Sequence, residues 1–457
     1  MSRLSDRLRE IVASRAEQAR PLREPSVDVR ERTVDARPSP DVAQALGGDW
    51  REDAHGTCLV VERRVDPAAA HGRARVGDFA AALREAAAWA PMLAGGAPVQ
   101  APFVFFDLET TGLSGGAGTY AFLVGCGWFD EEGGFVTRQF VMTRYADERP
   151  MLGTVAGELA RAGALVSFNG KSFDAPLLET RYLFHRLGWV GGDRPHLDVL
   201  HPARAFWARH DPAGVGAELA RPLNPRPACS LGVLEQEQLG ARRQGDVPGF
   251  EIPGRYFQFV RSGDARPLAP VLEHNRVDLL SLAGLTARLL LLVRDGAAAS
   301  CDPREAFALG RLYARAGLEA RAHEAYECAA RTAEGDALAG DALRALACLA
   351  RRARRFADAA GYWQQLLALR GCPRQLAREA NEALAIHHEH RVRDLAEAKR
   401  FALESLASLD VKLPPARIEA GRYRLARIER KIEVSLQSPV SNLQSEDGLD
   451  WGLATGD

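Results

Sequence analysis

Apolar and polar positions follow two different patterns along this chain, and the change comes near residue 300. Upstream of it, short apolar runs typical of buried strands occur at 103–106, 121–125, 135–141, 164–168 and 196–199. Apolar residues at helical spacing predict helices over 149–162, 177–187 and 267–294. Three strands in succession, followed by alternating helices and strands, indicate an α/β domain with a mixed sheet.

Downstream of residue 300, Ala- and Leu-rich helical sequence replaces the strand pattern. A short motif recurs around Leu318, Phe356 and Leu395, at intervals of 38 and 39 residues. Each copy has helical sequence on both sides. This predicts helix–turn–helix pairs with a period slightly above the roughly 34 residues of a tetratricopeptide (TPR) repeat. We therefore expect an all-α TPR-like helical repeat domain.

Shifts in composition indicate where these parts begin and end. The charged, Pro-bearing start, the Gly-Gly-Ala-Pro run and the polar C-terminal stretch serve as boundaries. The expected parts are a partly disordered N-terminal extension (1–50), a small accessory segment packing on the α/β domain (51–98), the α/β domain (99–298), the repeats (299–435) and a disordered tail (436–457). We expect a chain cut near residue 298 to keep a folded α/β domain.

The composition is that of a globular protein of the cytoplasm. Hydrophobic residues make up 46% of the 457 positions and charged residues 26%, which excludes collagen, a coiled-coil rod and wholesale disorder. No run reaches the ~18 apolar residues of a membrane helix, and charges follow Met1 where a secretory signal would have an apolar core. The seven cysteines form no C-x-x-C pair, which argues against a zinc site or a disulfide framework.

The charge balance limits how the chain could attract nucleic acid. A net charge of −1 gives no overall field for polyanions, so any such affinity must come from a local basic surface or from bound metal. Only four of the 59 basic residues are lysines. That skew, together with abundant Ala and Gly, is typical of a GC-rich bacterial genome.

Two carboxylates follow the first predicted strand. Asp107 and Glu109 are two residues apart in an extended chain, so they point to the same face of the sheet. Carboxylates this close repel each other unless a divalent cation neutralises them. The pair alone also fits a polar loop. However, Thr110-Thr111-Gly112 follows, and its glycine lets the backbone approach a ligand closely.

Two further acidic residues and a histidine complete the candidate set. Asp174 ends the segment 169–174 (Asn-Gly-Lys-Ser-Phe-Asp) after the fourth strand, where it could serve simply as a helix N-cap. His274 and Asp278 are four residues apart in the long predicted helix and so share one face. A structural pair would explain those two equally well. All of them together, in this order and on these elements, form a far more specific pattern.

This constellation resembles the DEDD exonucleases of the ribonuclease H-like (DnaQ-like) superfamily. In that family a D-x-E motif follows strand one, a second aspartate follows an Asn/Gly-rich strand end, and the last aspartate sits on a C-terminal helix. These positions are matched by Asp107, Glu109, Asp174 and Asp278. The segments 196–200 and 230–234 resemble the family's D-T-L and S-L-x-x-L landmarks, and 246–278 resembles the YprB branch, whose members often carry C-terminal TPR-like helices.

The resemblance implies a 3′→5′ exonuclease that hydrolyses DNA by a two-metal mechanism, at single-stranded ends and in DNA repair. Two Mg²⁺ or Mn²⁺ ions would be held by the four carboxylates, since such hard cations prefer oxygen ligands. His274 would orient or deprotonate the attacking water. It lies four residues before Asp278, the register of the family's tyrosine subclass, so the identity of the base stays open. We expect substrate contacts at Thr110, Thr111, Gly112, Leu113, Asn169, Lys171 and Asn275.

Other interpretations stay open beside this one. Arg242-Arg243 and Arg255-Tyr256 flank a Gly/Pro loop that either binds a strand by phosphate pairing and stacking or is merely solvated. An RNA exonuclease is the alternative among enzymes, and a TPR scaffold with a non-catalytic nucleic-acid-binding domain is the alternative outside them. We expect the repeats to dock a protein partner, such as a helicase or repair factor, and expect no membrane association.

Overall fold

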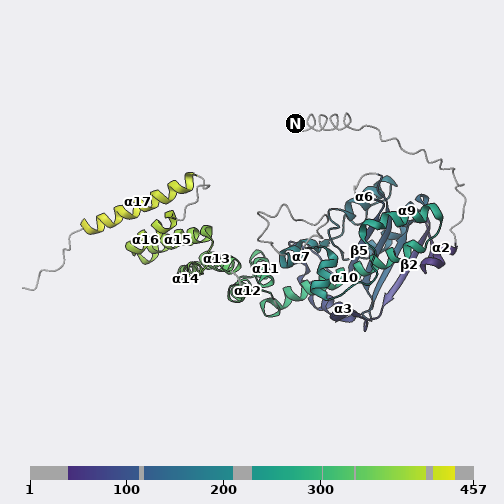
Figure 1. Cartoon of the computed structure of the whole chain (residues 1–457), viewed down its shortest axis with the longest axis horizontal. Coiled ribbons are helices and arrows are strands. Elements are labelled where there is room, and N and C mark those ends of the chain that lie inside the picture. The colour runs from purple at the N-terminus through teal and green to yellow at the C-terminus, as the bar shows by residue number, and fades with distance from the viewer. Residues whose placement is uncertain are drawn as a thin grey trace, which may run out of the picture. The chain divides into compact units, whose positions relative to one another are not determined.

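The computed structural model describes residues 40–112, 118–208, 229–300, 302–333, 336–407 and 415–437. Within these ranges the chain forms an α/β domain followed by a helix-rich C-terminal region (Figure 1). Most of the expected N-terminal extension, Leu113 and the tail from residue 438 lie outside the described residues. In the part that is described, no helix is both long enough and apolar enough to cross a membrane.

A seven-stranded mixed sheet forms the centre of the α/β domain, in the order β1-β2-β7-β6-β5-β8-β9. Its strands are β1 (Asp49–Asp53), β2 (Gly56–Val65), β5 (Phe103–Thr110), β6 (Ala121–Phe129), β7 (Phe135–Val141), β8 (Ala164–Ser167) and β9 (His196–Asp198). Neighbours from β1 to β5 are antiparallel, whereas β5, β8 and β9 are parallel. The mixed sheet and the five expected strands are confirmed.

The segment 51–98, expected as an accessory unit, contributes to the sheet itself. Its strand β2 pairs with β7 from Leu59 to Val65, and β1 forms the edge of the sheet. The four residues Cys58–Val61 are all buried, as a strand covered on both faces requires. The local pattern revealed this strand but not its partner, because β7 lies more than 70 residues further along the chain.

Helices cover both faces of the sheet. They are α3 (Val76–Ala86), α5 (Glu148–Ala160), α6 (Asp174–Phe184), α7 (Leu200–Trp207), α9 (Ile252–Ser262) and α10 (Ala269–Asp295). On β5, Phe105 packs in the core with α3, α7 and α10, whereas Phe106 packs in the core with α5, α6 and α9. Because strand residues alternate between faces, Asp107 and Glu109 share the face of Phe105, on which α10 lies.

The C-terminal region is a succession of helices. Their bounds are α11 (Pro303–Arg315), α12 (Glu319–Thr332), α13 (Asp336–Arg352), α14 (Phe356–Leu367), α15 (Arg374–His387), α16 (Leu395–Ala407) and α17 (Pro415–Gln437). Each helix contacts the next. Short turns join α11 to α12, α13 to α14 and α15 to α16, so each of these helix pairs is antiparallel. The turns lie at Leu318, Phe356 and Leu395, where the recurring motif predicted them.

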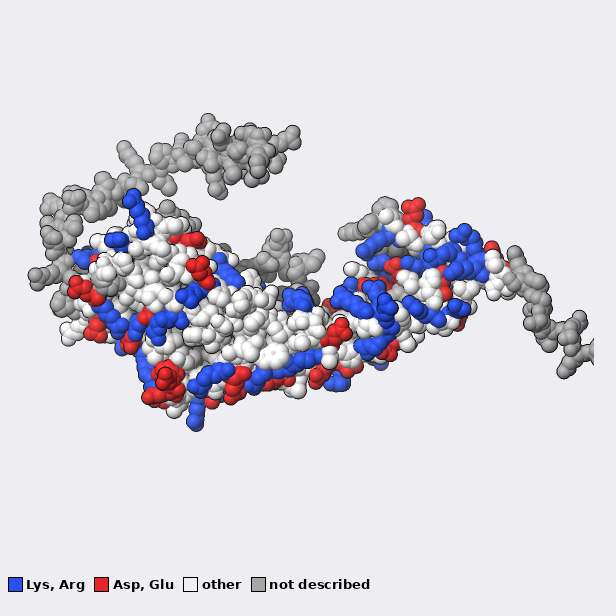
Figure 2. Space-filling model, turned by 180° about the vertical axis from the view of Figure 1, so that it is seen from behind, with Lys and Arg blue, Asp and Glu red and all other residues white. Residues whose placement is uncertain are grey.

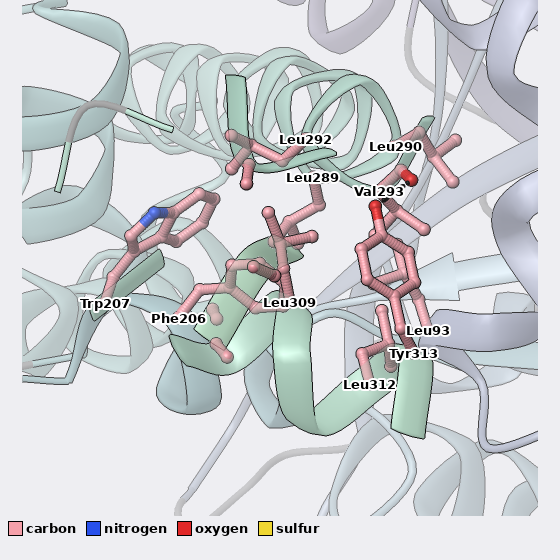
Figure 3. Close-up of a cluster of buried hydrophobic side chains, with 14 of the residues drawn as sticks. Leu93, Phe206, Trp207, Leu289, Leu290, Leu292, Val293, Leu309, Leu312 and Tyr313 are labelled. Atoms are coloured by element: carbon pink, nitrogen blue, oxygen red, sulfur yellow. Dashed lines mark hydrogen bonds between the residues drawn. The ribbon is translucent and has the colours of Figure 1, made fainter. Parts of the chain in front are cut away.

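The first helix pair is packed onto the α/β domain. Glu305 of α11 is 2% exposed and accepts hydrogen bonds from Trp207 Nε1 at 2.8 Å and from Arg288 at 3.0 Å. Around it lies one buried apolar cluster that includes Leu93, Phe206, Leu289, Leu292, Leu309 and Leu312 (Figure 3). A cut near residue 298 would uncover this cluster, so the structure does not support a self-contained α/β domain ending there.

Candidate metal centre

The carboxyl end of β5 carries the first two acidic residues. β5 is paired on both sides, with β6 and with β8, so its position is fixed by two strand ladders. Its register with β6 shifts between Glu109 and Thr110, a bulge that ends regular pairing. Asp107 and Glu109 therefore stand at the end of a rigid central strand, on the face that α10 covers.

Helix α10 brings His274 and Asp278 to this end of the strand. The two residues are one helical turn apart, and His274 Nε2 lies 3.3 Å from Asp278 Oδ2. One ligand atom each from Glu109, His274 and Asp278 lies within 4.8 Å of the other two. A strand and a helix more than 160 residues apart in the sequence thus converge on one point.

Asp174, the first residue of α6, joins this group electrostatically. Burial is the largest cause that raises the pKa of Asp107, followed by the charges of Asp278, Glu109 and Asp174. Burial, then Asp278 and Asp174, likewise raise the pKa of Glu109. The pKa of Asp174 rises to about 7, mainly through burial and then through Asp198. These carboxylates repel one another, and a bound cation would relieve that repulsion.

The guanidinium group of Arg243, in the loop before α9, lies against Asp278. Arg243 forms ion pairs with Asp278, Glu235 and Asp246. Burial lowers the pKa of Arg243, but Glu235 and Asp278 outweigh it, so the pKa is raised. His274 Nδ1 donates a hydrogen bond to Asp246 Oδ1 at 2.6 Å. Arg243, which the sequence suggested as a phosphate contact, is thus committed to carboxylates in this structure.

Asn275 lies behind Asp107, away from the open side of the site. Its side chain is fully buried, and its Nδ2 donates a hydrogen bond to Asp107 Oδ2 at 2.9 Å. Its Oδ1 accepts one from Gln139 Nε2, also at 2.9 Å. A Cβ atom on Gly125 of β6 would collide with this Oδ1. Asn275 was expected at the substrate; in the structure its side chain is buried and hydrogen-bonded to Asp107 and Gln139.

The residues after Glu109 fix the carboxyl end of β5 through hydrogen bonds. Thr110 Oγ1 donates a hydrogen bond to the Gly112 carbonyl at 2.9 Å. Thr111 Oγ1 accepts one from the Tyr120 backbone N–H at 3.0 Å. Both threonines are therefore engaged within the protein, whereas a Cβ on Gly112 would meet no atom within 4 Å. The substrate contact expected at Gly112 stays a prediction.

Sequence reasoning missed the part that Asp198 plays. Its carboxylate is 3% exposed and accepts hydrogen bonds from the backbone N–H groups of Asn169 at 2.7 Å and Lys171 at 3.2 Å. It thereby fixes the turn that leads to Asp174, in which Asn169 has a left-handed φ of 69°. The side chain of Lys171 is exposed. The signal was its place in the D-T-L-like segment 196–200.

The donor set suits a hard divalent cation. Asp107, Glu109, Asp174 and Asp278 offer only carboxylate oxygens, the ligands that Mg²⁺ and Mn²⁺ prefer. Burial raises the pKa of Asp107, Glu109 and Asp174, and the charges of nearby carboxylates raise it further. The residues present therefore fit the divalent metal that the family resemblance implies.

Comparison with known proteins agrees with this geometry. Residues 104–290 match the model of the RNase H superfamily, and this range contains all four carboxylates and His274. The chain is also 30% identical over 333 residues to the uncharacterized protein YprB of Bacillus subtilis (strain 168), an alignment that covers 72% of this chain and 74% of YprB. The α/β domain thus has the RNase H-like fold, and the chain belongs to the same protein family as YprB.

Proposed function

We propose that this chain is a metal-dependent exonuclease that hydrolyses DNA from the 3′ end of a single strand. Asp107, Glu109, Asp174 and Asp278 are the proposed ligands of two Mg²⁺ or Mn²⁺ ions. The observation that carries the proposal is the convergence of Glu109, His274 and Asp278 within 4.8 Å, beside Asp107. Divalent ions held there would stabilise the charge on the attacking and leaving oxygens of a phosphodiester.

His274 is the proposed general base. Because Nδ1 donates a hydrogen bond to Asp246 Oδ1, Nε2 of the neutral ring is left as the proton acceptor, and it lies 3.3 Å from Asp278 Oδ2. A water molecule positioned between these residues and the phosphorus atom would lose its proton to Nε2. Asp246 holds the imidazole ring in the orientation that this transfer requires. The register of His274, left open by the sequence, is supported by this arrangement.

RNA is the second candidate substrate, because metal ions held by carboxylates act on the phosphodiester backbone of either polymer. A non-catalytic binding domain is less well supported. A domain that only binds nucleic acid would have no need of four repelling carboxylates, namely Asp107, Glu109, Asp174 and Asp278. Crowded carboxylates lower the stability of the fold, and such a cost is typical of a catalytic site.

The experiment that tests the proposal uses one strand in two labelled forms. Purified full-length protein is incubated with DNA or RNA oligonucleotides labelled at the 5′ or the 3′ end, with Mg²⁺, Mn²⁺ or EDTA. We expect metal-dependent release of mononucleotide from the 3′ label and a stepwise ladder from the 5′ label. Loss of a mononucleotide from the 5′ end, cleavage at internal positions first, or no hydrolysis by a protein that binds Mn²⁺ would contradict the proposal.

A further inference from the structure

The helix pairs have two edges of different chemical character. Helices α11 to α17 contact one another in chain order, and the three helix pairs are antiparallel. The turns inside the pairs therefore lie along one edge of the array, and the connections between pairs lie along the other. We call the first edge the turn edge (314–318, 351–355 and 390–394) and the second the connection edge, of which the structure describes 333 and 368–373 outside the helices.

Arginine is concentrated on the turn edge. Its three turns, together with the helix ends that adjoin them, contain seven arginines against one acidic residue, Asp394; the arginines are Arg315, Arg351, Arg352, Arg354, Arg355, Arg391 and Arg393. Among its described residues, the connection edge contains one basic residue, Arg370, and no acidic one. Lys and Arg are prominent over the helix pairs in the space-filling view (Figure 2).

Arginines of successive turns lie near shared aromatic residues. Arg315 of the first turn and Arg352 of the second both lie near Tyr326, where their charges oppose the burial that raises the pKa of that phenol. Arg391 of the third turn has its guanidinium 3.9 Å from the centre of the Phe356 ring, at the start of α14. The three turns are thus linked in space and not only in sequence.

The arginines of the turn edge are exposed, and few carboxylates neutralise their charge. Among the described residues, no carboxylate lies within ion-pair distance of Arg315, Arg352, Arg354, Arg391 or Arg393 (all are exposed). A nearby acidic residue forms its ion pairs with another helix. Glu389, only two positions before Arg391, is buried and paired with Arg427 and Lys431. Like charges held in a row without partners are unfavourable for folding and favourable for binding a polyanion.

We propose that the arginines of the turn edge bind the sugar–phosphate backbone of a nucleic-acid strand, without reading its bases. This deepens the proposed function, on which it rests for the choice of polymer. A row of cations repeated from one helix pair to the next matches a polymer with one phosphate per nucleotide better than it matches a folded acidic protein. The helix pairs then hold the strand while the metal centre hydrolyses its end, in place of the protein docking that the sequence suggested.

The test measures binding separately from hydrolysis. Full-length protein in EDTA is titrated with a fluorescent 40-nucleotide strand over a series of salt concentrations. The variant Arg315→Gln/Arg352→Gln/Arg393→Gln removes one charge from each turn. We expect the salt slope to fall by about 2 and the Kd to rise roughly 100-fold at 0.1 M salt, since each single-strand phosphate contact contributes about 0.7 to the slope.

The matched control carries the same change on the other side of the array. Arg331, Arg370 and Arg374 are exposed, belong to or adjoin the connection edge, and pair with no carboxylate of the described residues. Their triple Gln variant is expected to bind with nearly wild-type affinity. Equal losses in both variants, or an unchanged salt slope in the turn-edge variant, would overturn the proposal. Turn-edge-dependent binding of polyglutamate, with no effect on DNA or RNA, would overturn it in favour of an acidic protein.

Hydrolysis is read in a separate arm of the experiment, with Mn²⁺ and a strand of six nucleotides. We expect the turn-edge variant to keep the wild-type kcat there, because so short a strand is held by the metal centre. If the wild-type protein binds the long strand through the turn edge but hydrolyses neither strand, the proposed function fails while the binding surface stands. A turn-edge variant that loses kcat on the short strand would contradict the division of roles.

Discussion

The metal centre and the turn edge handle charge in opposite ways. At the metal centre, Glu109, His274 and Asp278 converge on one partly buried point, and burial together with neighbouring carboxylates raises the pKa of Asp107 and Glu109. On the turn edge, arginines are exposed and spread over three turns of similar form. A converging site depends on every one of its members, whereas a distributed surface loses affinity in small, nearly equal steps. Substitutions can test that difference directly.

The largest effect is expected from the ligand on the central strand. Asp107→Asn should reduce hydrolysis to background, because the amide cannot supply the charge that holds the cation. The fold should stay intact or gain stability, since one source of repulsion is removed. Turnover and the midpoint of thermal unfolding are the measurements. Glu131→Gln, an exposed carboxylate on the turn between β6 and β7, is the control and should change neither. Near-wild-type turnover in Asp107→Asn would remove the basis for a converging site.

The next effect concerns proton transfer. His274→Gln should lower kcat by roughly 10²–10⁴-fold at saturating Mn²⁺, the usual contribution of a general acid–base residue. Metal affinity should change little, because the carboxylates supply the ligands. Asp246→Asn should lower kcat less, since it only loosens the orientation of the ring that its hydrogen bond fixes. If instead Mn²⁺ binding weakens while kcat survives, His274 is a metal ligand or a structural neighbour, and another group takes the proton.

A smaller effect is expected from a residue that touches neither metal nor substrate. Gly125→Ala would push Asn275 away from Asp107, because the new methyl group occupies the space of the Asn275 amide oxygen. Loss of such an orienting hydrogen bond typically weakens metal binding 10–100-fold. Gly157→Ala on α5, where a Cβ meets no atom within 4 Å, is the matched control. Calorimetric titration with Mn²⁺ measures both. Unchanged affinity in Gly125→Ala would show that Asp107 needs no support from α10.

Local patterns predicted much of the converging site. Strand alternation placed Asp107 and Glu109 on one face, and helical spacing placed His274 beside Asp278. Both relations depend on neighbours within a few residues, which is why sequence periodicity reveals them. The partner of β2 and the packing of α11 on α7 and α10 were missed, because they depend on segments far apart in the chain.

The supporting residues of the site were missed for the same reason. Arg243 looked like a residue of a solvated or phosphate-binding loop, and only the fold brings it against Asp278. Asn275 looked like a neighbour of the base, but the turn of the helix places it behind Asp107. The arginines of the turn edge were visible in the sequence as a compositional bias. Which edge they occupy follows only from the antiparallel order of the helices.

The smallest effect is expected from a single arginine of the distributed surface. Arg352→Gln alone should weaken binding of the 40-nucleotide strand about fivefold at 0.1 M salt, the value of one phosphate contact, with a salt slope lower by about 0.7. Arg315→Gln and Arg393→Gln should each do the same, and the three single effects should multiply to that of the triple variant, because exposed and separated contacts add in free energy. Fluorescence titration in EDTA gives all four constants. A single substitution that abolishes binding would show that the turn edge, like the metal centre, is a site that converges on one residue.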